Sequence, residues 1–536
     1  MAQLTVANPV AESTTYNVKP ADRPVDLRGK RIGLYWNIKA GGDYALDRTQ
    51  TLLQARYPDA TFVRILGSVG STVRHLTVAD ADRAAAECDV VVGTTGDCGG
   101  CTSWLAHDMK ELEGRGVATV AFVADHFVEH HRRTASTMGI PALPYAKMPF
   151  PFVNQTESFV HTMVDDGIDA VVHALTTAPE AGRSLSGLTL LGDPWLTFDA
   201  PDPYAALDAM NRAMIDWQYS DGLPLSPATA ERVDWLLTGT TRARDEVLGI
   251  LEPGDGVATV EKVAINAAMA GCSPAHPPVV IAAVECLLHP QLGLRRKAVT
   301  TGPSAPMIVV NGPARQHAGL SVGPCMLGPG SPAHANVVIG RALRLCLQNI
   351  GHTYPGISEM DTIGSPNKFS FCVAENEEHS PWNPFHVDHG VDPGTSAVTV
   401  VYTYGLTDLQ DFKSTAPEPA IRRFATGATY MGVNSTGHWL TGHRPNPRYG
   451  TDEQEKHFIL MAPEHTKIFD GAGWGKPEIG AAMHREARLP FGFLATRLET
   501  GAIRSGHPEL DWLWDSPDAL VPVLEGPECY EVVVAG

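Results

Sequence analysis

The sequence predicts an α/β protein whose N-terminal domain is an open, mostly parallel sheet of the Rossmann or flavodoxin type. Strand-like apolar runs alternate with helix-like stretches over residues 31–175, which is the pattern of parallel βαβ units. A glycine-rich loop at 95–102 joins one of these strands to the helix that follows it. The chain of 536 residues is longer than one hydrophobic core usually supports. We therefore expect a second, larger domain of α+β or α/β type towards the C-terminus.

Each element of the N-terminal sheet is predicted from a local pattern. Short apolar runs typical of buried strands occur at 31–37, 61–65, 89–93, 117–123 and 142–148. Helix-like stretches follow them at 41–53, 77–88, 102–112, 126–138 and 156–175. In such sheets ligands bind at the carboxyl ends of the strands, so the loop after the third strand is a natural place for a site.

The composition divides the chain into four segments. They are an irregular polar arm (1–28), the α/β domain (29–180), a linker rich in Pro, Gly, Asp and Ser (181–225), and a substrate-binding or catalytic domain (226–536). Within the last segment, helices are predicted at 229–237, 259–269, 278–288 and 334–350, and strands at 305–310, 395–404 and 457–462.

Charge and hydropathy argue against several classes of protein. The formal net charge of −19 argues against a nucleic-acid partner, because a protein that binds nucleic acid usually has a basic face. No apolar run reaches the roughly 18 residues of a membrane span. The N-terminus has no apolar signal-peptide core, so a cytoplasmic location is expected. The odd number of cysteines, nine, argues against a secreted disulfide framework, and buried reduced thiols are expected at Cys88, Cys286, Cys346 and Cys529.

The strongest candidate site is the loop Asp97-Cys98-Gly99-Gly100-Cys101. A thiol at a helix N-terminus meets free N–H groups and the positive end of the helix dipole, and both favour the thiolate. A cysteine three residues further on can attack an adduct on the first and close a disulfide. Asp97 is predicted to cap the helix or to act as a local acid, and His107 to face the same side of the helix.

A zinc half-site or two buried thiols would explain the same pair of cysteines. Zinc sites normally need a second Cys or Cys/His pair at finger-like spacing. The chain has no second C-x-x-C. Redox or nucleophilic chemistry at Cys98 and Cys101 is therefore the favoured interpretation.

The stretch Gly-Asp-Cys-Gly-Gly-Cys-Thr-Ser-Trp, with Glu-Leu-Glu-Gly-Arg-Gly at 111–116, resembles the UGSC family of (seleno)proteins over about residues 29–180. That family carries selenocysteine or cysteine at the first position of a U/C-G-S-C motif. The resemblance implies a strong, redox-capable nucleophile at Cys98, with Cys101 as its partner. Gly100 departs from the serine of the motif. Two later stretches, Ala-Gly-Cys-Ser-Pro and Ala-Glu-Asn-Glu-Glu-His-Ser-Pro-Trp, resemble sequences that accompany the family.

A second candidate site lies around Cys272, just after a helix that contains the polar residues Glu261, Lys262 and Asn266. Polar side chains in a buried helix need partners, so a catalytic role for Cys272 is one interpretation. A small residue in a tight turn between two helices is the other.

Two polar residues follow the Gly/Pro loop at 323–330, and they suggest an anion-binding site. Backbone N–H groups at a helix start bind anions, and an arginine pairs with carboxylate or phosphate. Arg341 and Asn336 lie on the helix that this loop opens. Both are predicted to contact substrate.

A dense group of carboxylates and imidazoles lies between residues 375 and 389. Substrate contacts are predicted for Glu375, His379 and Trp382, together with Asn311 at the end of a strand. The same region could instead bind a metal ion, in which case the ligands would be His379, His386 and His389. The spacing matches no metal signature, and a solvated acidic turn is the simpler alternative.

The leading hypothesis is a thiol-dependent enzyme that performs redox, sulfur-transfer or carbon–sulfur chemistry on a small molecule bound between the domains. A thiol reductant, or a thiol/disulfide reductase as partner, would regenerate the two thiols. The alternatives are a metal-dependent lyase or hydrolase centred on the histidines, and a thiol redox sensor. No cofactor is predicted beyond that reductant and, in one alternative, a metal ion. The oligomeric state is open, with a homo-oligomer among the options.

Overall fold

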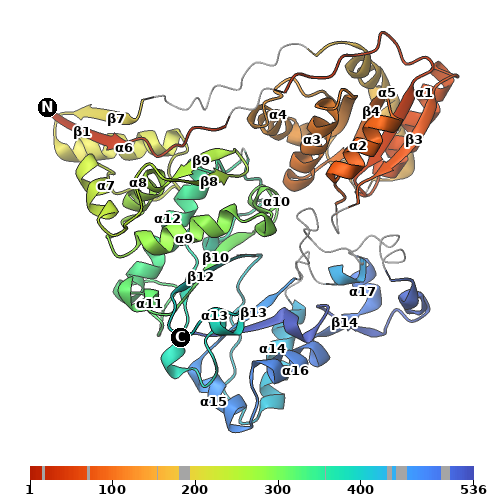
Figure 1. Cartoon of the computed structure of the whole chain (residues 1–536). Coiled ribbons are helices and arrows are strands. Elements are labelled where there is room, and N and C mark those ends of the chain that lie inside the picture. The colour runs from red at the N-terminus through yellow and green to blue at the C-terminus, as the bar shows by residue number, and fades with distance from the viewer. Residues whose placement is uncertain are drawn as a thin grey trace.

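The computed structural model describes residues 1–14, 18–68, 73–153, 155–179, 193–356, 358–430, 437–441, 455–496 and 507–536. Figure 1 shows two lobes, a first lobe within residues 18–179 and a second lobe formed by 1–14 and the described residues from 193 onwards. No described helix combines the length and the apolarity that crossing a membrane requires.

The first lobe is a five-stranded, wholly parallel sheet with helices on both faces, as the sequence predicts. The strand order is β3-β2-β4-β5-β6. The strands are β2 (Arg31–Trp36), β3 (Thr61–Leu66), β4 (Val90–Gly96), β5 (Ala118–Ala124) and β6 (Tyr145–Met148). The helices are α1 (Gly42–Arg56), α2 (Val78–Glu87), α3 (Gly99–Glu113), α4 (Val128–Thr137) and α5 (Glu157–Thr176).

The strand order sets where a ligand can approach. The chain passes from β2 outwards to β3 and then returns to β4 on the other side of β2. Helices α1 and α5 pack together, while α3 contacts α2 and α4. The loops that follow β2 and β4 therefore separate at the carboxyl edge of the sheet. This is the topological switch point, where open α/β sheets bind their ligands.

Close packing of α3 on β4 explains a glycine inside a buried strand. A Cβ at Gly93 would lie 2.9 Å from the Met109 side chain and 3.1 Å from Leu105. Every residue of β4 is buried. The helix that begins at Cys98 is therefore held directly against the strand that leads into it.

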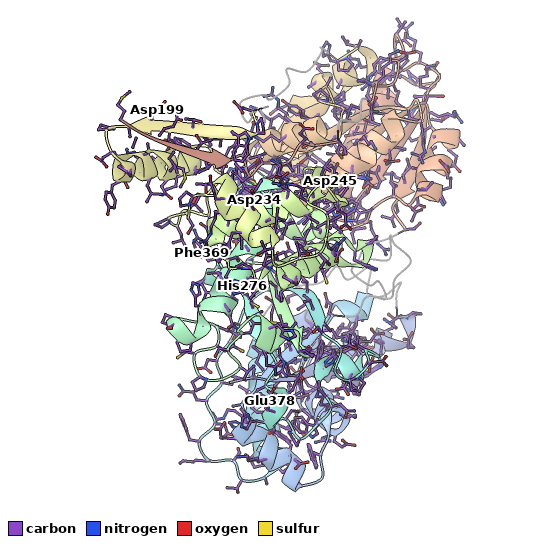
Figure 2. The ribbon with its side chains drawn as sticks, turned by 60° about the vertical axis from the view of Figure 1, so that its left-hand side comes forward. Asp199, Asp234, Asp245, His276, Phe369 and Glu378 are labelled. Carbon is purple, nitrogen blue, oxygen red and sulfur yellow. A yellow bond between two sulfur atoms is a disulfide. The ribbon has the colours of Figure 1, made fainter. Side chains whose placement is uncertain are left out.

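The prediction of an irregular arm and a linker is partly wrong, because a strand from each segment pairs with a strand from the other. Strand β1 (Ala2–Ala7) is antiparallel to β7 (Trp195–Ala200), and helix α6 (Pro203–Asp216) packs on both. Both strands alternate apolar with polar residues, as half-buried strands do. Val6 and Val10 lie in the core of the second lobe. In Figure 2, Asp199 marks this projecting part of the second lobe.

The rest of the second lobe has a helical layer and several small sheets. Helix α8 (Val260–Ala270) packs between α7 (Ala230–Leu237), α9 (Pro277–Leu288) and α12 (His334–Asn349). Strand β10 (Ala305–Asn311) is parallel to β11 (Cys372–Ala374) and antiparallel to β12 (Ala397–Thr403). Strand β13 (His457–Met461) is parallel to β16 (Tyr530–Val534). Parallel and antiparallel pairs occur together, so the second lobe is mixed α and β.

Shorter elements complete the second lobe. They are β8 (Val247–Leu251), β9 (Gly256–Thr259), α10 (Leu294–Ala298), α11 (Ala314–His317), α13 (Phe385–Asp388), α14 (Pro417–Tyr430), α15 (Pro463–Gly471), α16 (Lys476–Glu486), β14 (Arg488–Pro490), α17 (Phe491–Ala495) and β15 (Leu520–Pro522).

Two buried histidines predict an acid-sensitive fold. Burial lowers the pKa of His131 and of His352 from 6.5 to about 4. Between these values the unfolded chain binds protons that the folded chain does not. The free energy of unfolding should therefore fall as pH drops from about 6.5 towards 4, by up to ~3 kcal/mol per histidine. Above this window the two imidazoles should contribute no pH dependence.

Urea unfolding at pH 7 and pH 5 measures this effect. His352 contacts the Ser13 hydroxyl and the Tyr354 hydroxyl, so the variant His352→Gln keeps polar atoms in place but removes the titrating group. We expect a smaller loss of stability on acidification in His352→Gln than in the wild type. The exposed His173 offers the matched control His173→Gln. An identical pH dependence in wild type and His352→Gln would contradict the prediction.

Candidate active site at the Cys98 loop

The loop at the carboxyl end of β4 places Cys98 as the N-cap of α3. Its backbone is extended, and its Sγ accepts a hydrogen bond from the Cys101 backbone N–H at 3.2 Å. The side chain therefore takes the position of a capping oxygen, at the end of the helix where the dipole is positive. Both features stabilise negative charge on sulfur when Cys98 is reduced.

The two cysteines of the loop differ in their access to solvent. Cys98 is half-buried, whereas Cys101 is 1% exposed. A disulfide joins them, with their Cα atoms 5.4 Å apart. The Cys101 sulfur also lies 3.3 Å from the Cys98 carbonyl oxygen. A molecule from solution can therefore reach Cys98 first, while Cys101 is within bonding distance behind it.

Asn37 ties the loop after β2 to the end of β4. Its side chain donates to the Thr95 carbonyl at 3.0 Å and accepts from the Thr95 N–H at 2.9 Å. Its own backbone N–H donates to the Thr94 carbonyl. These bonds hold together the two loops that flank the switch point, so the Cys98 loop lies directly beside it.

Asp97 anchors a neighbouring loop instead of capping α3. Its Oδ2 accepts hydrogen bonds from the backbone N–H groups of Phe152 and Val153, at 3.2 and 2.8 Å. Burial raises the pKa of this carboxyl, opposed by those two bonds and by the positive charge of Lys39. Within the described residues, its Oδ1 is buried without a hydrogen-bond partner. A buried acidic group is thus adjacent in sequence to the half-buried Cys98.

The second lobe contacts the first lobe at this loop. A Cβ on Gly99 would lie 2.0 Å from the Val299 carbonyl oxygen and 2.9 Å from the Met360 side chain. Only glycine allows that approach, because any other residue would clash with the backbone after α10. Met360 also packs on the core of the first lobe. One wall of the approach to Cys98 therefore comes from the second lobe.

His107 does not reach the thiols. It lies six residues beyond Cys101 on α3, which corresponds to about 9 Å along the helix axis, and its ring packs against Trp104 at 5.5 Å. A different histidine supports the loop. His130 of α4 lies 3.0 Å from the Gly99 carbonyl oxygen and 2.9 Å from the Ser103 hydroxyl. It fixes the first turn of α3.

The structure does not bring Cys272 to the Cys98 loop. Cys272 is fully buried in the core of the second lobe, with its Sγ against the Val338 carbonyl. Burial raises the pKa of its thiol to about 12. The neighbouring Asn266 donates to the Pro9 and Lys262 carbonyls, and Lys262 donates to the Asn8 carbonyl. The geometry thus favours the structural interpretation, in which these polar residues bind the N-terminal segment.

Arg341 and Asn336 also hold the protein's own backbone. Arg341 makes a two-point ion pair with Asp221 at 2.7 and 2.9 Å and donates to the Leu223 and Pro224 carbonyls. Asn336 bonds to both backbone groups of Ser321. The predicted anion site is therefore occupied by side chains and carbonyls of the second lobe.

Asn311 and Glu375 meet at the ends of β10 and β11, as part of a buried polar cluster. The Asn311 amide donates to Glu375, and the Phe385 N–H donates to the same carboxylate at 2.7 Å. Burial raises the pKa of Glu375, opposed by Lys476. His379 is exposed and bonds to Asn376. Trp382 donates to the Trp474 carbonyl.

This cluster lies away from the cysteine loop. In Figure 2, Glu378 is in the lower part of the second lobe, well separated from the first lobe. A single pocket shared by Cys98 and His379 therefore has no support in the structure.

The three histidines predicted as metal ligands do not converge. His379 bonds to Asn376, His386 is buried, and His389 lies 3.3 Å from Glu531. Among the residues that the structure describes, no group of three or more His, Cys, Asp or Glu side chains could hold a metal ion. The metal-centre interpretation of this segment therefore has no support in the described residues.

Besides Asn37 and His130, sequence reasoning missed other contributors to the loop's surroundings. Lys39, on the loop after β2, acts on Asp97 through its charge, and so does His126 after β5. Both follow the carboxyl ends of strands, which is a signal the sequence offers. The contact of Gly99 with Val299 and Met360 joins residues 200 or more positions apart and has no local signature.

The fold and the loop together define the class of the first lobe. It is a flavodoxin-like α/β domain with a pair of cysteines at its switch point. The family model of the UGSC family matches residues 5–177, so this part of the chain is similar to that family. The comparisons with curated proteins and with solved structures give no significant match.

Proposed function

We propose that the protein is a dithiol enzyme in which reduced Cys98 attacks a sulfur atom of a small-molecule substrate and Cys101 resolves the adduct. The observation that carries this proposal is the N-cap position of Cys98. Its sulfur accepts a hydrogen bond from the Cys101 N–H at the start of α3, and Cys98 is the more exposed residue of the pair. The position at the switch point supports a ligand site there.

The proposed reaction is the reduction of a substrate with a sulfur–sulfur bond. The Cys98 thiolate attacks one substrate sulfur, so a Cys98–substrate disulfide forms and the other half leaves as a thiolate. The Cys101 thiolate then attacks Cys98 Sγ and expels the second half, which also leaves as a thiolate. The substrate gains two electrons and the Cys98–Cys101 disulfide holds the oxidised state. An external dithiol, free or on a reductase, would restore both thiols.

Two neighbouring groups would assist this chemistry. Asp97 keeps a proton to higher pH than an ordinary carboxyl, because burial raises its pKa, so it is our candidate for protonating a departing thiolate. Lys39 is half-buried nearby. Its charge would favour anionic species at the loop. Sulfur transfer or carbon–sulfur cleavage would use the same first attack with a different leaving group.

The test is to trap the first adduct. The reagent is dithiobis(nitrobenzoate), an aromatic disulfide, applied to the reduced chain in a Cys325→Ser background, because Cys325 is an exposed free cysteine. The parent should rapidly release two thiolates per chain as the disulfide closes. Cys101→Ser should release one, and mass spectrometry should find the aryl group on Cys98.

A matched control uses another buried cysteine. Cys346→Ser changes a fully buried thiol of the second lobe and should still release two thiolates. Release of two equivalents by Cys101→Ser, or aryl label on a residue other than Cys98, would overturn the proposal.

A further inference from the structure

A large cavity in the second lobe lies between two strand edges. It has a volume of about 1240 Å³ and is lined by residues of β12 and β13, with helices α9 and α14 at its sides. Among the described strands, β12 pairs only with β10, and β13 only with β16. The lining residues include none from the first lobe, and neither Val299 nor Met360 is among them, so the cavity is separate from the Cys98 loop.

The sheet β11-β10-β12 and the sheet β13-β16 together border the cavity. The Asn376 N–H, just after β11, donates to the Val534 carbonyl of β16 at 2.8 Å. The sheets are thereby joined on the side of β11 and β16, and open on the side of β12 and β13. One apolar cluster contains residues from all five strands, including Val309, Val373 and Val533. The cavity is the opening between β12 and β13, which is comparable to the mouth of a β-barrel, where ligands often bind.

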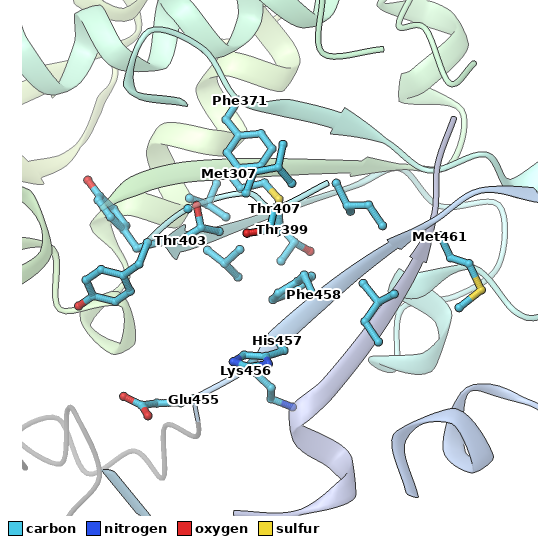
Figure 3. Close-up of a pocket in the computed structure, with 18 of the residues that line it drawn as sticks. Met307, Phe371, Thr399, Thr403, Thr407, Glu455, Lys456, His457, Phe458 and Met461 are labelled. Atoms are coloured by element: carbon cyan, nitrogen blue, oxygen red, sulfur yellow. The ribbon is translucent and has the colours of Figure 1, made fainter. Parts of the chain in front are cut away.

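The walls of the cavity are mainly apolar. Figure 3 shows Phe371 and Met307 on one side of the space and Phe458 on the other. Phe424, Met461 and Met483 add further ring and thioether surface. Such side chains adapt to flat or branched apolar molecules. The available volume exceeds the roughly 300–1,000 Å³ of typical small-molecule pockets.

Most of the charged side chains that line the cavity are engaged with other groups, while Asp408 is exposed to solvent. Glu285 pairs with Arg242, Lys456 with Glu531, and His465 with Asp411. His289, Lys297 and Glu455 also have interaction partners. Apart from the exposed Asp408, these groups offer no spare counter-ion, so a charged ligand that enters the cavity would lose its hydration without compensation from them.

Neutral hydrogen-bonding groups remain at one end of the cavity. Burial lowers the pKa of His457 to about 4, so its imidazole is uncharged at neutral pH. Thr403 and His457 lie at this end in Figure 3, with Thr399 further in. The Thr403 hydroxyl already donates to the Ala305 carbonyl at 3.3 Å, so it can offer its oxygen as an acceptor. With His457 and the open backbone edges of β12 and β13, it can bond to uncharged polar atoms.

We infer that the second lobe binds a neutral, mainly apolar small molecule in the mouth between β12 and β13. The molecule would place its apolar body among Met307, Phe371 and Phe458 and its hydrogen-bonding end towards Thr403 and His457. This site goes beyond the proposed chemistry at Cys98 and does not depend on it.

Binding of the neutral naphthalene dye prodan to the full chain tests the inference. We expect a blue-shifted, saturable signal with one dye per chain. Thr399→Trp fills the middle of the cavity and should weaken binding at least about tenfold. Thr426→Trp is the matched control, because Thr426 lies on the exposed face of α14, and it should bind as the wild type does.

Two further measurements separate this inference from misfolding of a variant and from the proposal for Cys98. Hydrogen exchange of β12 and β13 in the wild type should slow when dye is bound, which does not rely on any variant folding. Cys98→Ser should bind the dye normally, so this proposal and the one for Cys98 can fail separately. Unsaturable binding, equal binding by Thr399→Trp, absence of protection, or tighter binding of the anionic dye anilinonaphthalene sulfonate would overturn the inference.

Discussion

Serine at position 98 is expected to abolish the release of both thiolates from an aromatic disulfide. A serine hydroxyl is a weak nucleophile without an activating base and forms no disulfide. Cys101, at 1% exposure, is poorly placed to replace it. The rate of the first release should fall by more than about 1,000-fold. Stopped-flow absorbance of the released thiolate, in the Cys325→Ser background, gives both rate and stoichiometry.

The same substitution should leave the fold intact. Serine is among the preferred N-cap residues, so α3 should begin at the same place, and the melting temperature should hardly change. The matched control is Cys272→Ser, at a thiol whose pKa burial raises to about 12. It should keep the rate and both equivalents. Normal release by Cys98→Ser would exclude Cys98 as the nucleophile, and loss of release in Cys272→Ser would favour Cys272.

The parallel sheet could be predicted because its signals are local. Buried parallel strands are short apolar runs, and the predicted 31–37 and 61–65 correspond to β2 and β3 within one residue. The predicted strand at 142–148 begins too early, since β6 starts at Tyr145. Prolines at 141 and 144 precede that start, and proline cannot donate in a strand ladder.

The arm and the linker could not be predicted, because each is structured only by the other. The partners in β1 and β7, such as Val6 and Leu196, are about 190 residues apart. A two-stranded ribbon is marginal by itself and needs a helix to cover it. Here α6 supplies that cover. No local window contains all three parts.

The geometry of the cysteine loop could be predicted, and the partners of the polar residues in the second lobe could not, for the same reason. Cys98 and Cys101 lie on one helical turn, so three residues of spacing decide their geometry. Arg341, in contrast, depends on Asp221, and Glu375 on Asn311. A sequence shows that such polar residues need partners, but it does not show whether the partner is a substrate or the chain itself.

The largest loss of stability is expected from removing Arg23. Its guanidinium and the Glu113 carboxylate, with side chains 2% and 0% exposed, form a two-point ion pair at 2.7 and 2.8 Å. The same carboxylate accepts from the Ala21 N–H and from the Thr119 N–H and hydroxyl. Arg23→Ala would leave a buried charge without its counter-ion. We expect the first lobe to lose about 3–5 kcal/mol of unfolding free energy.

Hydrogen exchange along β4 and β5 measures this loss in the first lobe alone. The control is Lys19→Ala, since the Lys19–Asp22 pair has side chains 84% and 95% exposed and should contribute less than about 1 kcal/mol. Arg23→Lys should recover only part of the loss, because an ammonium cannot reproduce the two parallel bonds. A change below about 1 kcal/mol in Arg23→Ala would show that water reaches the carboxylate. The predicted loss would instead show that the segment before β2 is structurally part of the first lobe, because it carries the counter-ion for the last residue of the helix that Cys98 begins.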